Sequence, residues 1–380
     1  MREQERNRYI TLSLLLFLGV VMRYWVMTFG HNYDFESYCI VGDIAGHLQN
    51  VYAQTERYNY GPIFFCLLGL LYRVSFLISK DPILTYRVLL VSVFTLADLG
   101  IAFFIAGKKN IKYALIFFLN PVSIIITGFH NQFDNIAVLS ALYSLYFYNE
   151  DQEIGKKDYL FIIFMSLSLM IKHILFLVPV FILLKKGLPP VKKIMYAFVP
   201  PGIFLISFVP FALSSRAAFD GILHNVFLYR SSNNAPLLWY IYKLIHYPQY
   251  LSFPIYIIIM CILGFVIRKK NFDDCLMIYL IAMVAFSSAI ENQYLIIPMA
   301  ALCILKLDVW NYIYMFAMTV FLFLNKNGFG QLSAIKEHLP DIIGKLLNFY
   351  NDHGYMIAVW LLFVALIYEL KLREYIKKGV

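Results

Sequence analysis

Apolar runs recur from one end of the 380-residue chain to the other, and short polar stretches separate them. Each run has about 17 to 25 residues, enough for an α-helix to cross a hydrocarbon core of about 30 Å. A helix satisfies its own backbone hydrogen bonds, which lipid cannot do. The pattern predicts an all-α fold, a polytopic transmembrane helical bundle with about 10–12 membrane segments.

Composition agrees with this fold. Hydrophobic residues make up 61% of the chain and charged residues only 14%, whereas about a quarter of the residues of a soluble domain are charged. The net charge of +9 does not indicate nucleic-acid binding, because most Lys and Arg residues lie in short clusters between apolar runs. The five cysteines have no metal-ligand spacing. We expect one integral-membrane domain over residues 1–380.

Basic clusters predict which segments face the cytoplasm, since cytoplasmic loops are enriched in Lys and Arg. These segments are residues 2–8, 108–112, 155–158, 185–193, 268–270 and the tail from Lys371. The non-cytoplasmic face would then hold residues 29–60, 128–134, 213–249, 288–294 and 325–355, which contain nearly every unusual polar residue. In its first and last large loops, apolar residues at helical spacing predict helices that lie along the membrane surface.

The number of apolar runs conflicts with this assignment. If runs 61–79 and 84–106 both cross the membrane, the basic cluster at 108–112 falls outside. We prefer the arrangement in which one of these runs does not cross fully and residues 159–184 enter and leave on the cytoplasmic side. About 26 residues are too few for two full spans, so we expect a broken or re-entrant helix that lines a cavity.

An acidic and aromatic stretch, HNYDFESY at 31–38, follows the first apolar run. In an extended segment residues i and i+2 point the same way, so we expect Asp34 and Glu36 to face one ligand. Their functional interpretation is a catalytic pair, with a base for an acceptor hydroxyl, or a pair that holds a metal or positions a sugar. The alternative is an ordinary hydrated loop at the interface, where a carboxylate costs far less than at the bilayer centre.

Two further polar groups adjoin apolar runs on the same predicted face. YNYGPI at 58–63 begins a run, and FHNQFDN at 129–135 separates two runs that contain almost nothing else polar. Such groups are costly unless they face water or a ligand, and amides and donors of this kind suit sugar hydroxyls or a phosphate. A helix start with an aromatic belt and a short polar turn are the respective alternatives. The candidate binding residues are Tyr60, His130, Gln132 and Asp134.

Cations at unusual places complete the candidate site. Lys172 and His173 lie inside an apolar run, where a lysine must snorkel, pair or bind an anion. A phosphate is one candidate partner, and a structural acid such as Asp98 is the other. Arg230 is a cation on the predicted non-cytoplasmic side, suited to a phosphate or a sugar, with contact to the membrane surface as the alternative. Glu291 separates two runs on the same face.

Taken together, these motifs resemble the GT-C superfamily of integral-membrane glycosyltransferases. The acidic motif Asp34-Phe35-Glu36 matches the one that those enzymes carry after their first helix. VYAQTERYNYGP and NPVSIIITGFHNQFDN resemble segments of the mannosyltransferases of glycosylphosphatidylinositol assembly and their bacterial relatives. FHNQF and SLMIKHILFLVP are similar to motifs of the dolichyl-phosphate-glucose-dependent ER glucosyltransferases, with His173 in place of a Gln. The resemblance covers residues 8–185, and residues 186–380 match only in architecture.

The resemblance implies an inverting hexosyltransferase, with mannose as one candidate sugar. The donor would be a polyprenyl- or dolichyl-phosphate sugar, with its phosphate near Lys172 and Arg230, and the acceptor a lipid-linked or cell-surface glycan. Asp34 would be the base and Glu36 its support. No cofactor is required, although Asp34 and Glu36 could hold a divalent metal.

Two other function classes stay open, namely a transporter or flippase of lipid-linked sugars and a non-catalytic subunit of a glycan-assembly complex. The transporter class should show related halves of the chain, and none is evident. The predicted outer loops contain no Asn-x-Ser/Thr sequon, which favours a bacterial plasma membrane over the ER for this multi-pass protein.

Overall fold

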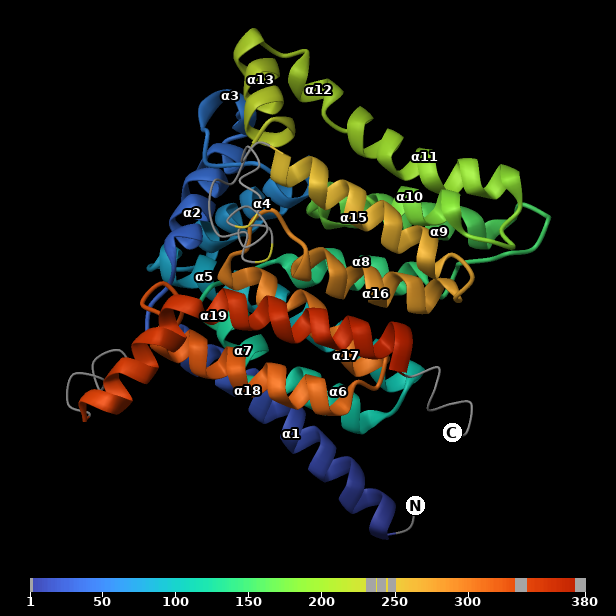
Figure 1. Cartoon of the computed structure of the whole chain (residues 1–380). Helices are drawn as coiled ribbons and strands as arrows, with labels where there is room; N and C mark the ends of the chain where they lie inside the picture. The colour runs from blue at the N-terminus through green and yellow to red at the C-terminus, as the bar shows by residue number, and fades with distance from the viewer. Residues whose placement is uncertain (1–2, 230–236, 238–243, 245–250, 332–339, 373–380) are drawn as a thin grey trace.

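The computed structural model describes residues 3–229, 237, 244, 251–331 and 340–372 (Figure 1). Every regular element within these ranges is a helix. The first half of the chain contains α1 (Glu3–Met27), α2 (Tyr33–Gly46), α3 (Val51–Gln54), α4 (Pro62–Ile78), α5 (Pro82–Lys108), α6 (Ile111–Phe118), α7 (Pro121–Gly128), α8 (Asp134–Ser144), α9 (Lys156–Ile171), the 3-10 helix η1 (His173–Leu175) and α10 (Val178–Leu184).

The second half of the chain is helical as well. Its elements are α11 (Pro190–Ile206), α12 (Val209–Ala212), α13 (Arg216–Gly221), the π-helix η2 (Ile222–Phe227), α15 (Ser252–Ile267), α16 (Phe272–Ala285), the 3-10 helix η4 (Asn292–Leu295), α17 (Ile297–Ile304), α18 (Asp308–Leu324), α19 (Asp341–Ile367) and η6 (Tyr368–Leu372). The all-helical prediction is therefore confirmed for the described residues.

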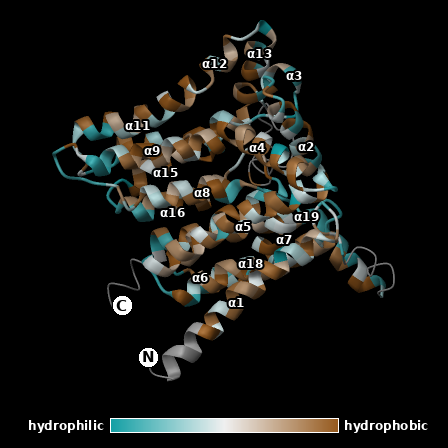
Figure 2. Ribbon diagram, turned by 180° about the vertical axis from the view of Figure 1, so that it is seen from behind, coloured by the Kyte–Doolittle hydropathy of each residue, from teal (hydrophilic) through white to brown (hydrophobic). Residues whose placement is uncertain are grey.

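Four of the described helical segments are long and apolar enough to cross a membrane, or up to six if each of two bent pairs counts as one span. The four are Ile10–Met27, Pro82–Lys108, Pro190–Ala212 and Asp341–Lys371, and the bent pairs are α6 with α7 and α9 with α10. The ribbon of these helices is coloured largely, though not throughout, as hydrophobic (Figure 2). The architecture is compatible with an integral membrane protein. It has fewer long spans in the described part than the 10–12 expected, because several apolar runs fold as shorter or bent helices.

Local sequence explains where the helices break. Asn120 accepts a hydrogen bond from the Val122 backbone N–H at 2.9 Å, and Pro121 occupies the first turn of α7. An Asn cap followed by proline begins a new helix, so α6 and α7 meet at a bend of 48°. At Lys172 the backbone is extended, with φ −150° and ψ 124°, and α9 meets the following helical segment at 112°.

The sharp bend makes residues 156–184 a re-entrant segment. Lys185 Nζ lies 3.1 Å from Glu150 Oε1, and Lys192 Nζ lies 2.7 Å from Asp158 Oδ1. These ion pairs hold the start of α9 and the end of α10 at the same end of the bundle. The expected break in this helix is confirmed, and the two ends of the segment lie at the same end of the bundle.

The predicted cytoplasmic segments gather at the end of the bundle where α9 starts and α10 ends, which we call the basic end. Lys108 pairs with Asp273 at 2.7 Å, and Lys270 lies 3.8 Å from Glu369. The first turns of α1, the end of η6 and the links from α8 to α9 and from α15 to α16 lie toward the same side, on the right of Figure 1. The clusters are far apart in sequence, so their meeting supports the reading of them as one face.

The run that forms α4 does not reach the basic end. Phe64 lies beside Phe94 of α5, with ring centroids 6.5 Å apart, and Tyr72 lies beside Tyr86 at 5.3 Å. Hence α4 runs antiparallel to the first half of α5, and α5 alone continues to Lys108. Of the two runs between 61 and 106, α5 is long enough to cross a membrane and α4 is a shorter apolar helix. That one of them does not cross fully stays a prediction.

The two predicted surface-helix loops differ. Residues 29–60 contain the short helices α2 and α3, as expected. Residues 341–355, by contrast, are the first half of α19, a continuous helix of 27 residues. The expected helix is present there, but it continues into the next apolar run, because nothing in DIIGKLLNFYNDHG breaks it. Its place at the membrane surface stays a prediction.

Candidate functional site

A cavity of about 1570 Å³ opens at the end of the bundle opposite the basic clusters. Its walls come from α2, the loop before α4, the loop after α7, the break between α9 and α10, α11, η2, α15 and the segment before η4. The predicted site residues that line it are Asp34, Tyr60, His130, Lys172, His173 and Glu291. Gln132 and Asp134 are buried, Glu36 is not among the lining residues, and Arg230 lies outside the described residues.

The segment that carries Asp34 and Glu36 is helical, so the expected extended conformation is wrong. Asn32 caps α2, and its side-chain oxygen accepts from the Asp34 backbone N–H at 3.2 Å. Residues two apart on a helix point about 200° apart around its axis. Asp34 therefore faces the cavity, while the Glu36 side chain is 56% exposed and lies 3.8 Å from Arg57. The two carboxylates do not face one ligand.

Two amides hold the Asp34 carboxylate. Asn32 Nδ2 donates to Asp34 Oδ2 at 3.1 Å, and Gln132 Nε2 donates to the same oxygen at 2.5 Å. Among the described residues, no donor reaches the other carboxylate oxygen, Oδ1. The first helical turn also favours a negative charge. This arrangement orients Asp34 with one oxygen available to the cavity.

His130 contacts Asn32, one of the two amides that hold Asp34. Asn32 Nδ2 also donates to His130 Nδ1 at 3.1 Å, so His130 accepts with a neutral ring. Burial lowers the pKa of His130 to about 3, which keeps the ring uncharged at neutral pH. His130 was expected to bind a sugar or phosphate, and the structure adds a contact through which it positions Asn32.

The second charged pair lies at the break in the re-entrant segment. Lys172 Nζ is 2.6 Å from Asp134 Oδ1, and the exposed fractions of the two side chains are 5% and 0%. Of the two partners expected for Lys172, a phosphate or an acid such as Asp98, the structure shows an acid, but it is Asp134. Lys172 engages only one Asp134 oxygen, and Asp134 is not among the residues that line the cavity. Its expected role at a ligand stays a prediction.

Aromatic rings surround the Lys172 ammonium group. Its Nζ lies 5.0 Å from the centroid of Phe133 and 5.4 Å from those of Tyr60 and Tyr294. A lysine has three N–H donors, and Asp134 takes one. Since Lys172 lines the cavity, it can still donate to an anion there. Ring faces at this distance attract a cation and hold it in place.

Glu291 brings a second carboxylate to the cavity from the C-terminal half of the chain. It precedes η4, and the neighbouring Asn292 fixes this segment, because its side chain donates to Asn327 O and accepts from Tyr355 Oη, both at 2.9 Å. Burial, and then the nearby Asp34 charge, raise the pKa of Glu291. The glutamates that share the cavity lining with Asp34 are thus Glu56 and Glu291, and Glu36 is not among them.

One side of the cavity is apolar. Residues of the re-entrant segment, α11, η2 and α15 form it, namely Ile174, Phe176, Phe204, Val226, Phe227, Phe253 and Tyr256. His173 lies at its edge, with its ring 6.4 Å from that of Phe204. The cavity therefore has a polar side around Asp34 and an apolar side made of aromatic and aliphatic side chains.

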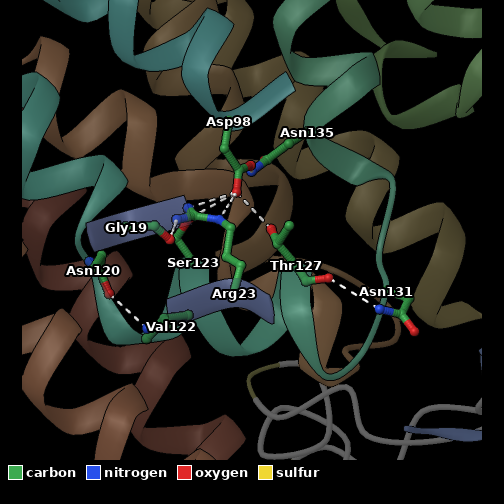
Figure 3. Close-up of polar contacts among 9 residues, drawn as sticks. All are labelled: Gly19, Arg23, Asp98, Asn120, Val122, Ser123, Thr127, Asn131 and Asn135. Carbon is green, nitrogen blue, oxygen red and sulfur yellow. Dashed lines mark hydrogen bonds and ion pairs between the residues drawn. The ribbon is translucent and has the colours of Figure 1, made fainter. Parts of the chain in front are cut away.

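Sequence reasoning missed a buried network around Asp98 (Figure 3). Arg23 Nη2 lies 2.8 Å from Asp98 Oδ2, which also accepts from Ser123 and Thr127. Both charged side chains have no exposed area. The sequence signal for this network was Arg23, a cation inside the first apolar run, where a charge needs a partner. No residue of this network lines the cavity.

No group of three or more His, Cys, Asp or Glu side chains within the described ranges could hold a metal ion. Asp34 lines the cavity and Glu36 does not, so the two carboxylates do not converge there on the divalent metal that they could have held. Compared with known proteins, the chain matches no protein-family model, and no curated protein is similar to it.

Proposed function

We propose that the chain is an integral-membrane glycosyltransferase of the GT-C type. It transfers a hexose from a polyprenyl-phosphate donor to a glycan or glycolipid acceptor on the non-cytoplasmic face. The observation that carries the proposal is a single cavity in which an oriented carboxylate, a lysine and an apolar wall meet. A lipid-phosphate sugar has the three matching parts, namely a reactive sugar carbon, a phosphate and an isoprenoid chain.

The loop after α7 links the base to the cation. Gln132 holds Asp34 at 2.5 Å, and Asp134, two residues later, holds Lys172 at 2.6 Å. Because a short backbone segment joins these two contacts, movement of one alters the other. Catalysis depends on such fixed placement of the groups that act on the two substrates.

In the proposed reaction, the acceptor hydroxyl gives its proton to Asp34 while its oxygen bonds to the anomeric carbon of the donor sugar. The bond from that carbon to the phosphate oxygen breaks, and lipid phosphate leaves. Attack and departure on opposite faces invert the anomeric configuration. Lys172 stabilises the charge that grows on the leaving phosphate.

The apolar side accommodates the lipid. Phe176 lies in the turn between η1 and α10, Phe204 on α11 and Phe253 on α15. Burying an isoprenoid chain against them is favourable at about 25 cal/mol per Å². The membrane in question is proposed to be a bacterial plasma membrane, in keeping with the lack of sequons in the chain.

The test is Asp34→Asn in purified protein, assayed with a panel of polyprenyl-phosphate hexoses that begins with mannose. The matched control is Asp43→Asn, since Asp43 lies on the same helix with a side chain that is 53% exposed. Loss of general-base catalysis should lower kcat about 10²–10⁴-fold, while Asp43→Asn transfers at the wild-type rate. Undiminished turnover in Asp34→Asn would overturn the assignment of the base. Absence of transfer by the wild type across the panel would overturn the glycosyltransferase itself.

A further inference from the structure

Arg57 lies at the rim of the cavity, in the loop between α3 and α4. Its guanidinium carbon is 3.9 Å from the centroid of the Tyr33 ring. Stacking of this kind fixes a planar guanidinium and lowers the entropy lost when it binds. Tyr33 immediately precedes Asp34, so this cation stands beside the proposed base.

Two N–H groups of the Arg57 guanidinium make no hydrogen bond within the described part of the chain. Its Nε and Nη2 atoms are buried and have no hydrogen-bond partner among the described residues. The Glu36 carboxylate is 3.8 Å from Nη2, which is beyond hydrogen-bond distance. Buried N–H donors of a charged group are almost always paired in folded proteins, so these two donors, unpaired among the described residues, have capacity for a ligand at the cavity rim.

The shape of these donors selects the partner. A guanidinium presents parallel N–H groups that match the two oxygens of a carboxylate or a phosphate. A lysine cannot make this paired contact, so the arginine at this position favours an oxyanion over a neutral hydroxyl group.

The position of Arg57 assigns the oxyanion to the acceptor. Its neighbours Tyr33 and Glu36 are 65% and 56% exposed, so this rim faces the aqueous side. The proposed donor phosphate instead belongs at Lys172, whose side chain is 5% exposed. Two cations at different depths therefore serve two different substrates.

We propose that Arg57 binds a phosphate or carboxylate group on the acceptor glycan and so makes the enzyme prefer acidic acceptors over neutral ones. The inference rests on the proposed function, because it names the acceptor class of the same site. Binding at Arg57 places the neighbouring acceptor hydroxyl beside Asp34.

The kinetic test compares the wild type with Arg57→Gln and Arg57→Lys in lipid nanodiscs. The acceptors are a neutral hexose disaccharide, its 6-phosphate and a disaccharide that contains a uronic acid. Arg57→Gln should raise KM for the two acidic acceptors about tenfold or more, with KM for the neutral acceptor and for the donor within about twofold. Arg57→Lys should restore part of the loss, because it keeps the charge without the paired donors. Comparison of the phosphate and carboxylate arms shows which group is preferred.

The control is Arg216→Gln. Unlike Arg57, Arg216 does not line the cavity, and its side chain is 83% exposed. It should leave every KM unchanged. An equal loss for neutral and acidic acceptors, or a change in KM for the donor, would contradict the assignment of Arg57 to the acceptor.

A direct binding measurement separates this inference from the proposed function. The 6-phosphate disaccharide and its neutral counterpart are titrated into the wild type and Arg57→Lys by calorimetry. The wild type should bind the phosphorylated form at least about tenfold more tightly, and Arg57→Lys should narrow that ratio. Equal affinities in the wild type would overturn the inference even if hexose transfer is observed. Conversely, absence of transfer with selective phosphate binding would overturn only the proposed function.

Discussion

Two buried charge clusters in this protein differ in how completely their hydrogen-bonding capacity is used. Around Asp98, one carboxylate oxygen accepts from Asn135 and the other from Arg23, Ser123 and Thr127. Around Lys172, the Asp134 Oδ2 atom is buried without a partner in the described part of the chain, and the lysine borders the cavity. Both oxygens of the Asp98 carboxylate are thus engaged, whereas one oxygen of the Asp134 carboxylate is not and the paired lysine borders the cavity.

The difference teaches how to read a charge inside an apolar run. Burying an ion pair costs free energy, so a charged residue inside an apolar run is unusual. Both clusters contain such a residue, and the sequence alone does not distinguish them. Only the pattern of partners distinguishes a contact that joins α1, α5 and α7 from one that can bind a substrate. We therefore expect the Asp98 cluster to govern stability and the Lys172 cluster to govern activity as well.

Asp98→Asn should have the largest effect on stability. It leaves the Arg23 guanidinium buried without its counter-ion, and removal of one partner of a buried pair costs about 3–5 kcal/mol. Thermal and denaturant unfolding in detergent, with Asp43→Asn as the control, measure this loss. Arg23→Met combined with Asp98→Leu should recover much of it. A loss below about 1 kcal/mol for Asp98→Asn would show that the network is not the stabilising contact assumed here.

Lys172→Met should cost less stability, about 2–3 kcal/mol, because the stranded Asp134 lies beside the cavity and can become protonated. It should also raise KM for the donor about tenfold or more, since the phosphate loses a charged partner. Arg23→Met is the comparison, because it also removes a buried cation. If it changed KM for the donor as much as Lys172→Met does, the proposed distinction between the two clusters would be wrong.

A smaller, pH-dependent effect should come from His130. Its pKa of about 3 in the folded protein is lower than the value of about 6.5 expected in the unfolded chain. The folded state therefore binds fewer protons, so the contribution of His130 is complete above pH 6.5 and declines as the pH falls toward 3.

Between pH 6.5 and 5.5 this linkage predicts a loss of about 1.4 kcal/mol at most from one histidine. Unfolding of the wild type and His130→Gln over this range measures it, since the variant lacks the titrating ring. Parallel pH profiles for the two proteins would contradict the buried neutral state of His130.

The re-entrant segment was predictable from sequence because length and charge restrict it. Basic clusters flank residues 159–184, and the run is too short for two spans. The structure places its break at Lys172. Burying the charge beside Asp134 favours a break where backbone groups and a side chain can face a cavity.

The pairing of Asp34 was not predictable in the same way. Alternation of residues suggested Glu36 as its companion, whereas the Asn32 cap begins a helix and turns Glu36 outward. A cap residue followed by acids in the first turn is a recognised helix start. Asn32, Asp34 and Glu36 form this pattern, so the sequence did contain the signal for a helix. The sequence placed Glu291 on the same predicted face, but nothing in it showed that Glu291 lines one cavity with Asp34, because the two lie more than 250 positions apart.

The sequence by itself determined that the chain forms helices, that its basic clusters lie on one face and that its polar residues concentrate on the other. These properties follow from hydropathy and charge along the chain, which act locally. The tertiary structure alone decided that Lys172 pairs with Asp134 rather than Asp98, that Arg57 joins the rim and that Glu291 replaces Glu36. Such choices depend on which helix faces meet, and helix packing brings together residues whose separation in sequence carries no information about distance.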